Sequence, residues 1–403
     1  MKKILTLLIV FVFAGFISAC QQEVTSPVVV SKLYDATSQA NNVIELYNNS
    51  DVDEDLSDYT IQVFTNGATE PQKTFALSGT IAANSYFEIT GSTATDAQVL
   101  AASNFAYSEG SLPFNGNDAI AVVKKDTIID FLGYTGMDIS FALDVTLIRI
   151  GEVSAFTPST TYDEFNFITY IPDAFQYLKN ETYEIKTLDQ LLDGPRLEER
   201  YLELPYKDPD NDTLGTGGAV LVTSNGVTDG DTANFNALNG YPGGALRYFY
   251  INTPEVDGGS YVSAEPWGYV ASKYNKQFLL IDSSQKEIRI QSVPGYSLTE
   301  SNGRNLGFVW INGYLSQFLI VSEGLTEDVG SSYDAYDLAL TYKNVPYLTF
   351  LRFAEQRARE NGWGLHGYPT NPDGEKSPDW NYQSYSNATH DPVWTPHLAL
   401  PWA

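Results

Sequence analysis

Short apolar segments, separated by turns rich in Asn, Asp and Gly, are the feature that most restricts the fold of this chain. They recur through the first third of the sequence. The expected strands are 43–47, 56–61, 77–81, 86–89, 119–123 and 127–133. Strands of this length with such turns between them are typical of a β-sandwich. Abundant Tyr and scarce Met also favour β-rich domains over helix bundles.

The first twenty residues form a targeting segment. Lys2 and Lys3 precede the apolar stretch Ile4–Phe16, which is short for a transmembrane helix. The segment ends at Cys20, the single cysteine of the 403 residues, so no disulfide can form within the chain. It resembles a bacterial lipoprotein signal, which implies lipidation of Cys20 and anchoring to the extracellular face of the cell membrane. An ordinary signal peptide that contains a cysteine is the alternative.

The charge of the chain argues against a nucleic-acid partner held by long-range attraction. The formal net charge is -27, with -19 in residues 1–212 and -8 in residues 213–403. A polyanion would be repelled by either half. Nucleic-acid chemistry on this chain would therefore depend on local positive groups and on a bound metal ion.

Three sequence pieces in the first half resemble the lamin tail domain family. They are IELYNNSDVDEDLSDYTI, LSGTIAANSYFEI and LPFNGNDAIAVVKKDTIIDFLG, and the resemblance covers residues 26–182. It implies an immunoglobulin-like β-sandwich that serves as a binding or spacer module and carries no catalytic residues. The acidic stretch Asn48–Asp55 could bind calcium, but turn chemistry explains it more simply.

A second β-rich unit is expected after a linker at residues 183–217, in which Asp208–Asp212 is solvated and 188–202 has a weak helical pattern. The expected strands are 219–223, 233–236, 246–251, 286–293 and 306–311. Apolar spacing predicts helices at 264–274, with Ser263 as N-cap, and at 313–322 and 347–361. Residues 368–403 have no periodicity and are expected to form an irregular tail that wraps the domain.

Four short motifs in this unit stand in one order. They are Asp-Gly-Asp-Thr in VTDGDTANF, the Arg and then the Thr-Pro-Glu of RYFYINTPE, and the Gly-Arg of TESNGRNLGFVWING. The segments NGYLSQFLIVSEGL and FAEQRARENGWGLHG follow them. Each is weak alone, since Asp-Gly is a common hairpin turn. Together they resemble the staphylococcal nuclease (thermonuclease) family over residues 218–367. The resemblance implies an OB-fold, a five-stranded barrel with three helices.

The same resemblance implies a calcium site. Asp231 and the backbone carbonyl of Thr253 match the ligands of the family, and Asp229 is expected to hold the turn behind them. Oxygen ligands of this kind suit a hard divalent cation. Asn252 stands where the family has an aspartate, so its amide oxygen brings no charge, and a lower affinity for metal is expected.

The resemblance also implies the catalytic residues. Glu255 matches the general base that activates a water molecule, while Arg247 and Arg304 match the arginines that bind the phosphate. The planar guanidinium group donates two hydrogen bonds to two phosphate oxygens. His366, His390 and His397 are too scattered for a zinc site. Tyr333 and Tyr336 lie where the family often has nucleotide-stacking tyrosines, and chance explains them equally well among 27 tyrosines.

The sequence thus predicts a mostly β protein of two domains, a lamin-tail-type sandwich followed by an OB-fold. Its expected function is that of a secreted, membrane-anchored, calcium-dependent endonuclease, a monomer that hydrolyses DNA and RNA with little sequence preference. The alternative is a non-catalytic cell-surface binding protein with a degenerate nuclease domain. A cell-surface or polysaccharide partner of the sandwich is compatible with both.

Overall fold

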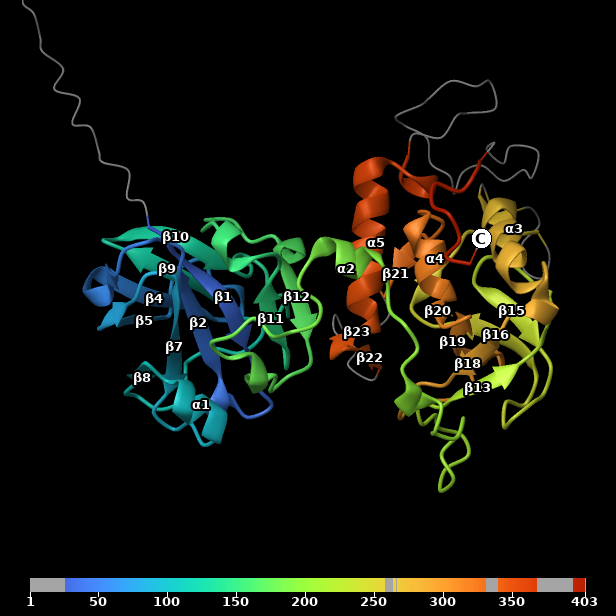
Figure 1. Cartoon of the computed structure of the whole chain (residues 1–403), viewed down its shortest axis with the longest axis horizontal. Coiled ribbons are helices and arrows are strands. Elements are labelled where there is room, and N and C mark those ends of the chain that lie inside the picture. The colour runs from blue at the N-terminus through green and yellow to red at the C-terminus, as the bar shows by residue number, and fades with distance from the viewer. Residues whose placement is uncertain (1–25, 258–263, 266, 331–339, 368–393, 403) are drawn as a thin grey trace, which may run out of the picture.

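The computed structural model describes residues 26–257, 264–265, 267–330, 340–367 and 394–402. These residues form two β-rich units that lie side by side (Figure 1), and the prediction of a mostly β fold is confirmed. Cys20, Ser263, Tyr333, Tyr336 and His390 fall outside the described residues. Within the described part, no helix has the length and apolar character needed to span a membrane.

The first unit packs a six-stranded sheet against a four-stranded sheet. The larger sheet has the order β12 (Phe167–Tyr170), β11 (Thr146–Arg149), β1 (Val28–Tyr34), β2 (Val43–Asn48), β7 (Ser85–Gly91) and β8 (Phe105–Tyr107). The smaller sheet has the order β10 (Thr127–Leu132), β9 (Ala119–Lys124), β4 (Tyr59–Phe64) and β5 (Lys73–Ala76). A short pair, β3 (Glu54–Asp55) and β6 (Thr80–Ile81), and the helix α1 (Ala97–Ala102) complete the unit.

Alternation of side chains explains how the two sheets of this unit pack. In β4, Ile61 and Val63 are fully buried between the sheets, whereas Thr60 and Gln62 face outward and are half-buried. Successive residues of a strand point to opposite faces, so this register places one apolar row in the core. Short 3-10 turns link the strands at Gln39–Asn41, Leu56–Asp58, Thr65–Gly67, Val153–Ala155, Glu164–Asn166 and Phe175–Tyr177.

The segment expected to be a linker joins the two units but is packed along much of its length. It contains α2 (Leu188–Leu192) and a 3-10 turn at Glu199–Tyr201. A capping box between Thr187 and Gln190 starts α2, which is much shorter than the helical pattern at 188–202. Leu191, Tyr201 and Tyr206 are buried in the core that the second unit also uses.

The second unit contains one large sheet, and its two edge strands are neighbours in the sequence. The order is β13 (Ala219–Val222), β18 (Ile288–Gln291), β19 (Asn305–Ile311), β16 (Gly244–Tyr248), β15 (Thr232–Phe235) and β14 (Ser224–Val227), and β20 (Tyr314–Leu315) pairs with β19. β16 and β19 run parallel, and the other neighbours run antiparallel. β13 and β14 stand at opposite ends of this order, although only Thr223 separates them in the chain.

Three helices cover the sheet of the second unit, close to the predicted positions. They are α3 (Gly268–Leu279), α4 (Ser316–Ser322) and α5 (Tyr347–Asn361), and a 3-10 turn follows at Gly364–His366. The bounds predicted for α5 are confirmed, and Gly362 ends it in a left-handed conformation. α3 begins four residues later than predicted, because the Glu265 N–H donates to the Glu255 carbonyl oxygen at 2.9 Å and Trp267 has a φ of 73°. Further short elements are β17 (Ile251–Asn252), β21 (Asp328–Val329), β22 (Thr341–Tyr342), β23 (Val345–Pro346) and the 3-10 turn Ser283–Gln285.

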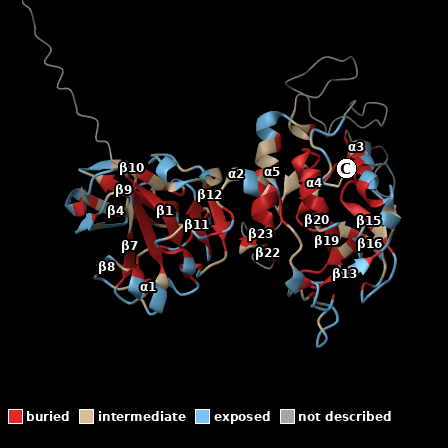
Figure 2. Ribbon diagram, viewed as in Figure 1, coloured by how far each residue is buried: buried red, intermediate tan, exposed pale blue. Residues whose placement is uncertain are grey.

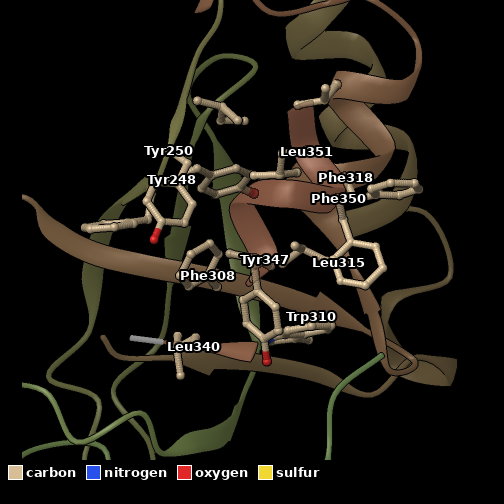
Figure 3. Packing of buried hydrophobic residues seen from close by; sticks show 14 of the residues in the cluster. Tyr248, Tyr250, Phe308, Trp310, Leu315, Phe318, Leu340, Tyr347, Phe350 and Leu351 are labelled. Carbon is tan, nitrogen blue, oxygen red and sulfur yellow. The ribbon is translucent and has the colours of Figure 1, made fainter. Parts of the chain in front are cut away.

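An aromatic cluster under α5 fixes this helix on the sheet (Figure 3). The Tyr347 ring packs edge-on against Phe308 and Trp310, with ring centroids 5.5 Å and 5.3 Å apart. All three side chains are fully buried. Edge-to-face aromatic pairs add about 0.5–1.5 kcal/mol each beyond the area that they bury.

The core of the second unit extends into the first unit, which also has a separate core between its two sheets. Ile148 and Tyr170 of the first unit belong to the same buried cluster as the interior of the second. Their strands β11 and β12 are buried and are drawn in red in Figure 2. At the contact, the Phe165 and Phe353 rings lie 5.3 Å apart, and Arg352 pairs with Glu164 at 2.5 Å. A contact that is apolar inside and ionic at its margin favours a fixed relation between the units.

Candidate functional site

The turn between β14 and β15 buries two carboxylates. Asp229 and Asp231 are 4% and 0% exposed. The Asp231 N–H donates to Asp229 Oδ1 at 3.1 Å, and Asn275 Nδ2 of α3 donates to the Asp229 carbonyl oxygen at 3.0 Å. A Cβ on Gly230 would lie 2.6 Å from Thr253 Oγ1, so only glycine lets the turn pack this closely. The Asp229 carboxylate is thus bonded within the turn that carries Asp231.

Asp231 is surrounded by donors from three segments. The Thr253 N–H and hydroxyl donate to Oδ2 at 2.6 Å and 3.1 Å. The Thr232 hydroxyl donates to Oδ1 at 3.1 Å, and the Arg247 guanidinium group forms an ion pair with the same oxygen. Arg247 reaches it because β16 pairs with β15 in a register that sets Arg247 opposite Thr232.

Arg247 also joins Asp231 to the segment that carries the predicted metal ligand Asn252. Its Nη2 donates to Asn252 Oδ1 and to the Ile251 carbonyl oxygen, the latter at 3.3 Å. The side-chain oxygens of Asp231 and Asn252 therefore both face one guanidinium group. This brings together three of the residues that the sequence predicted to act as one site.

Glu327 is a member of this cluster that the sequence analysis missed. Asn252 Nδ2 donates to Glu327 Oε2 at 2.5 Å, and the Glu327 N–H donates to the Asn252 carbonyl oxygen at 2.7 Å. Pairing of β17 with β21 produces this contact, since Asn252 stands opposite Asp328. Asn252 and Glu327 are 75 residues apart, and no local sequence pattern indicates a pairing over such a distance. The contact could therefore not be predicted from the sequence.

Glu255 and Arg304 lie close enough to Asp231 for their charges to affect one another. Arg304 forms an ion pair with Glu300, and its Nη1 donates to Thr232 Oγ1 at 3.4 Å. Glu255 is half-buried, and its N–H donates to Glu265 Oε2 at 2.9 Å. Burial and the Asp231 charge raise the pKa of Glu255, and the nearby charges of Arg247 and Arg304 oppose this.

The electrostatics of the site show an excess of buried negative charge. Burial raises the pKa of Asp231 to about 7, although the Arg247 charge lowers it. Burial and the Glu255 charge likewise raise the pKa of Asp229. A cation placed among these carboxylates would be favoured, because it offsets both their mutual repulsion and their desolvation.

The candidate metal ligands are all oxygen donors. Within the described ranges, no group of three His, Cys, Asp or Glu side chains is arranged to hold a metal ion. The predicted set differs from such a group, because only Asp231 contributes a carboxylate and Asn252 and Thr253 contribute neutral oxygens. Asp231 Oδ1 and Asn252 Oδ1 already converge on one cationic group, so these donors suit Ca²⁺ rather than a softer metal.

The two described histidines lie elsewhere in the second unit. His397 stacks on Trp363 with ring centroids 4.8 Å apart and an interplanar angle of 6°. Burial lowers the pKa of His366 to about 4, so this side chain is neutral near pH 7. Neither residue contacts the Asp231 cluster through an interaction described above.

Comparison with known proteins bears on the first unit. Residues 21–136 match the family model of the Lamin Tail Domain. The match ends after β10, so β11 and β12 lie beyond it. A search of curated proteins found no match for the chain. The fold and the match together define a β-rich protein whose N-terminal part is an immunoglobulin-like lamin tail domain; this chain carries that domain in front of a second β unit.

Proposed function

We propose that the second unit is an OB-type barrel and a calcium-dependent phosphodiester hydrolase that cleaves DNA and RNA with little sequence preference. The strand order supports the barrel, because Ala219–Val227 supplies β13 and β14 and these form the two ends of the sheet path. A strand that pairs at both ends of a sheet closes it. The parallel pairing of β16 with β19 also suits this topology.

The convergence of Asp231, Arg247, Asn252 and Thr253 is the observation that carries the proposal. Asn252 and Thr253 are consecutive, but Asp231 and Arg247 come from other parts of the chain, and direct contacts of Asp231 and Arg247 link all four residues. A chain with a net charge of -27 has little general attraction for a polyanion. A local arrangement of arginine and buried carboxylate is what such a chain would need in order to act on a phosphodiester.

The residues can be given roles in an in-line attack by water. Glu255 accepts the proton of the attacking water, and its raised pKa brings it closer to the operating pH of a general base. Arg304 and Arg247 donate to the phosphate oxygens and stabilise the negative charge that develops there. Arg247 does so by exchanging one of its contacts with Asp231 and Asn252 for a phosphate oxygen.

The cation belongs to the same proposal. Ca²⁺ would be held by the Asp231 carboxylate, Asn252 Oδ1 and the Thr253 carbonyl oxygen, and it would supply positive charge next to the phosphate. Asp229 holds the turn that positions Asp231. We further propose that lipidation of Cys20 anchors the protein, as a monomer, to the extracellular face of a bacterial membrane.

A second candidate function is supported by a specific observation. Both arginines already have carboxylate partners, Asp231 for Arg247 and Glu300 for Arg304. In a non-catalytic surface protein these ion pairs would simply stabilise the fold. The lamin tail domain would then be the functional part, with a cell-surface or polysaccharide partner.

Digestion of single-stranded DNA by the chain from Gln21 onward separates these functions. The proposal expects cleavage with added calcium and loss of cleavage with a chelator. Calorimetry with calcium provides the companion measurement, because Asp231→Asn should abolish the binding heat. Calcium binding that is unchanged in Asp231→Asn, together with no cleavage, would favour the surface protein.

A further inference from the structure

A cavity of about 400 Å³ lies in the second unit, away from the Asp231 cluster. It is lined by residues of α2, α3, α4, α5 and the C-terminal segment 394–402, which Figure 1 shows in red beside α4. Tyr314, Phe318 and Leu398 form apolar and aromatic parts of its wall. A volume of this size with such walls is typical of small-molecule sites.

Arg357 of α5 lines this cavity and is the exception among the arginines of the chain. All nine arginines lie within the described residues, and eight of them form ion pairs. The paired ones are Arg149, Arg196, Arg200, Arg247, Arg289, Arg304, Arg352 and Arg359. Arg357 Nε and Nη2 are buried, and neither has a hydrogen-bond partner in the part of the chain that the structure describes. Arg357 as a whole is half-buried, and its guanidinium group stands 5.6 Å from the centre of the Trp363 ring. Buried N–H donors without an acceptor are costly, and an anion that accepts from Nε and Nη2 would remove that cost.

A carboxylate near Arg357 is already committed to another contact. Both Glu323 oxygens accept backbone N–H groups of the C-terminal segment, from His397 and Leu398, at 2.8 Å each. Glu323 acts on Arg357 only through its charge, which opposes the lowering of the Arg357 pKa by burial. Glu323 therefore holds the segment that closes the cavity and leaves the guanidinium donors available.

The polar lining of the cavity is positive, in contrast to the chain as a whole. The charged residues that line it are Arg357, Arg196 and Asp193, and the last two form an ion pair at 2.9 Å. The Arg196 guanidinium group also stacks on the Tyr314 ring at 4.0 Å. Ser322 lines the same cavity, and its buried hydroxyl has no hydrogen-bond partner among the described residues.

We propose that this cavity binds a small organic anion, a carboxylate or phosphate group carried on an aromatic body. The anionic group pairs with Arg357 and accepts from the Ser322 hydroxyl, since guanidinium groups suit both carboxylate and phosphate. The aromatic body packs against Tyr314 and Phe318. This site is independent of the proposed phosphodiester chemistry, because its lining shares no residue with the Asp231 cluster.

Titration of the chain from Gln21 onward with 8-anilinonaphthalene-1-sulfonate tests the site, because this probe combines an aromatic body with an anion and fluoresces in apolar surroundings. A saturable, single-site rise in fluorescence is expected for the native protein. Arg357→Leu should weaken binding at least about tenfold, the effect of losing a charged hydrogen bond. Arg359→Leu is the matched control, because Arg359 is an exposed arginine on the same helix, and it should bind like the unmodified chain.

A second variant and a competition measurement complete the test. Leu398→Trp, which fills the cavity but leaves Arg357 in place, should also weaken binding if Arg357→Leu fails to fold. Displacement of the probe by a nucleoside monophosphate would identify a phosphate ligand, and displacement by indole-3-acetate a carboxylate. The proposal is overturned if the probe does not saturate, if Arg357→Leu folds and binds like Arg359→Leu, or if neither competitor displaces the probe.

Discussion

Asn252 is a neutral residue between the positive Arg247 and the negative Glu327 of the proposed site. Its side chain bridges Arg247 and Glu327 through the two ends of one amide. A carboxylate only accepts hydrogen bonds, so Glu327 fixes the amide nitrogen on its own side and turns Oδ1 toward Asp231 and Arg247. Glu327 thus adds negative charge near a position where the sequence carries a neutral amide.

Paired substitutions at these two positions test this orientation. Asn252→Asp alone places a second carboxylate directly against that of Glu327. The double variant, Asn252→Asp with Glu327→Gln, restores an amide donor at position 327 and leaves the negative charge at position 252, on the Asp231 side. We expect the double variant to bind calcium about tenfold more tightly than the unmodified chain, since charge on the ligands raises calcium affinity. Glu327→Gln alone should bind calcium less tightly.

Calorimetric titration with calcium measures all three variants. Glu287→Gln is a suitable control, because Glu287 is an exposed carboxylate on the same unit outside the cluster. Equal calcium affinities for Glu327→Gln and the control would contradict a role of Glu327 in the site.

At the scale of elements, the start of α3 positions Glu255. Gly268, the first residue of the helix, packs against the Glu255 backbone, and a Cβ there would overlap the Glu255 carbonyl oxygen. The sequence predicted α3 and α5 from their apolar spacing. It could not place the first residue of α3, because a hydrogen bond from Glu265 to Glu255, a tertiary contact, holds the preceding residues out of the helix.

Gly268→Ala should therefore displace Glu255 and affect function more than folding. Overpacking of this kind costs about 1–3 kcal/mol of unfolding free energy, and the proposed cleavage rate should fall with it. Gly226→Ala is the control, since a Cβ at Gly226 meets only Asn234 at an ordinary 3.8 Å. Chemical denaturation and a cleavage assay on both variants check this. A fully active Gly268→Ala would show that the position of Glu255 does not matter.

The strands β2 and β7 of the first unit carry a buried charge pair of like sign. Glu88 stands opposite Glu45 in the register and is fully buried, with Lys179 Nζ at 3.0 Å. Glu45 itself pairs with Lys32 at 2.6 Å. Burial first and the Glu45 charge second raise the pKa of Glu88 from the ordinary 4.5 to about 8.

This shift makes the stability of the first unit depend on pH. Between pH 4.5 and 8 the folded state keeps a Glu88 proton that the unfolded chain has lost, so the unfolding free energy should fall as pH rises through this window. Glu88→Gln should make that fall smaller. Denaturation at pH 5 and pH 8 measures it, with the exposed Glu70→Gln as control. Identical pH dependence in the two variants would contradict the assignment.

At the scale of the whole molecule, much of the architecture could be predicted from sequence. Alternating apolar residues located several strands of the sandwich and of the second sheet, but not β5, β8 or β12, and residues 56–58, expected to begin a strand, form a 3-10 turn. The spacing in Leu348, Leu351, Ala354 and Ala358 located α5, in which all four are buried. The buried Tyr201 and Tyr206 of the expected linker could not be anticipated, since their burial depends on a core shared by both units. The contact of Glu327 with Asn252 and the cavity lined by Arg357 could not be predicted either, because both are formed by segments that lie far apart in the chain.

The rate of calcium-dependent DNA cleavage in Glu255→Gln tests the proposed function most directly. The variant keeps the shape of the side chain but removes the proton acceptor, so the fold and calcium binding should be retained. We expect cleavage to fall by about 10²–10⁴-fold, the contribution of general acid–base catalysis, while Glu287→Gln cleaves at the rate of the unmodified chain. Cleavage by Glu255→Gln at the unmodified rate, or no calcium-stimulated cleavage by the unmodified chain, would contradict the proposal.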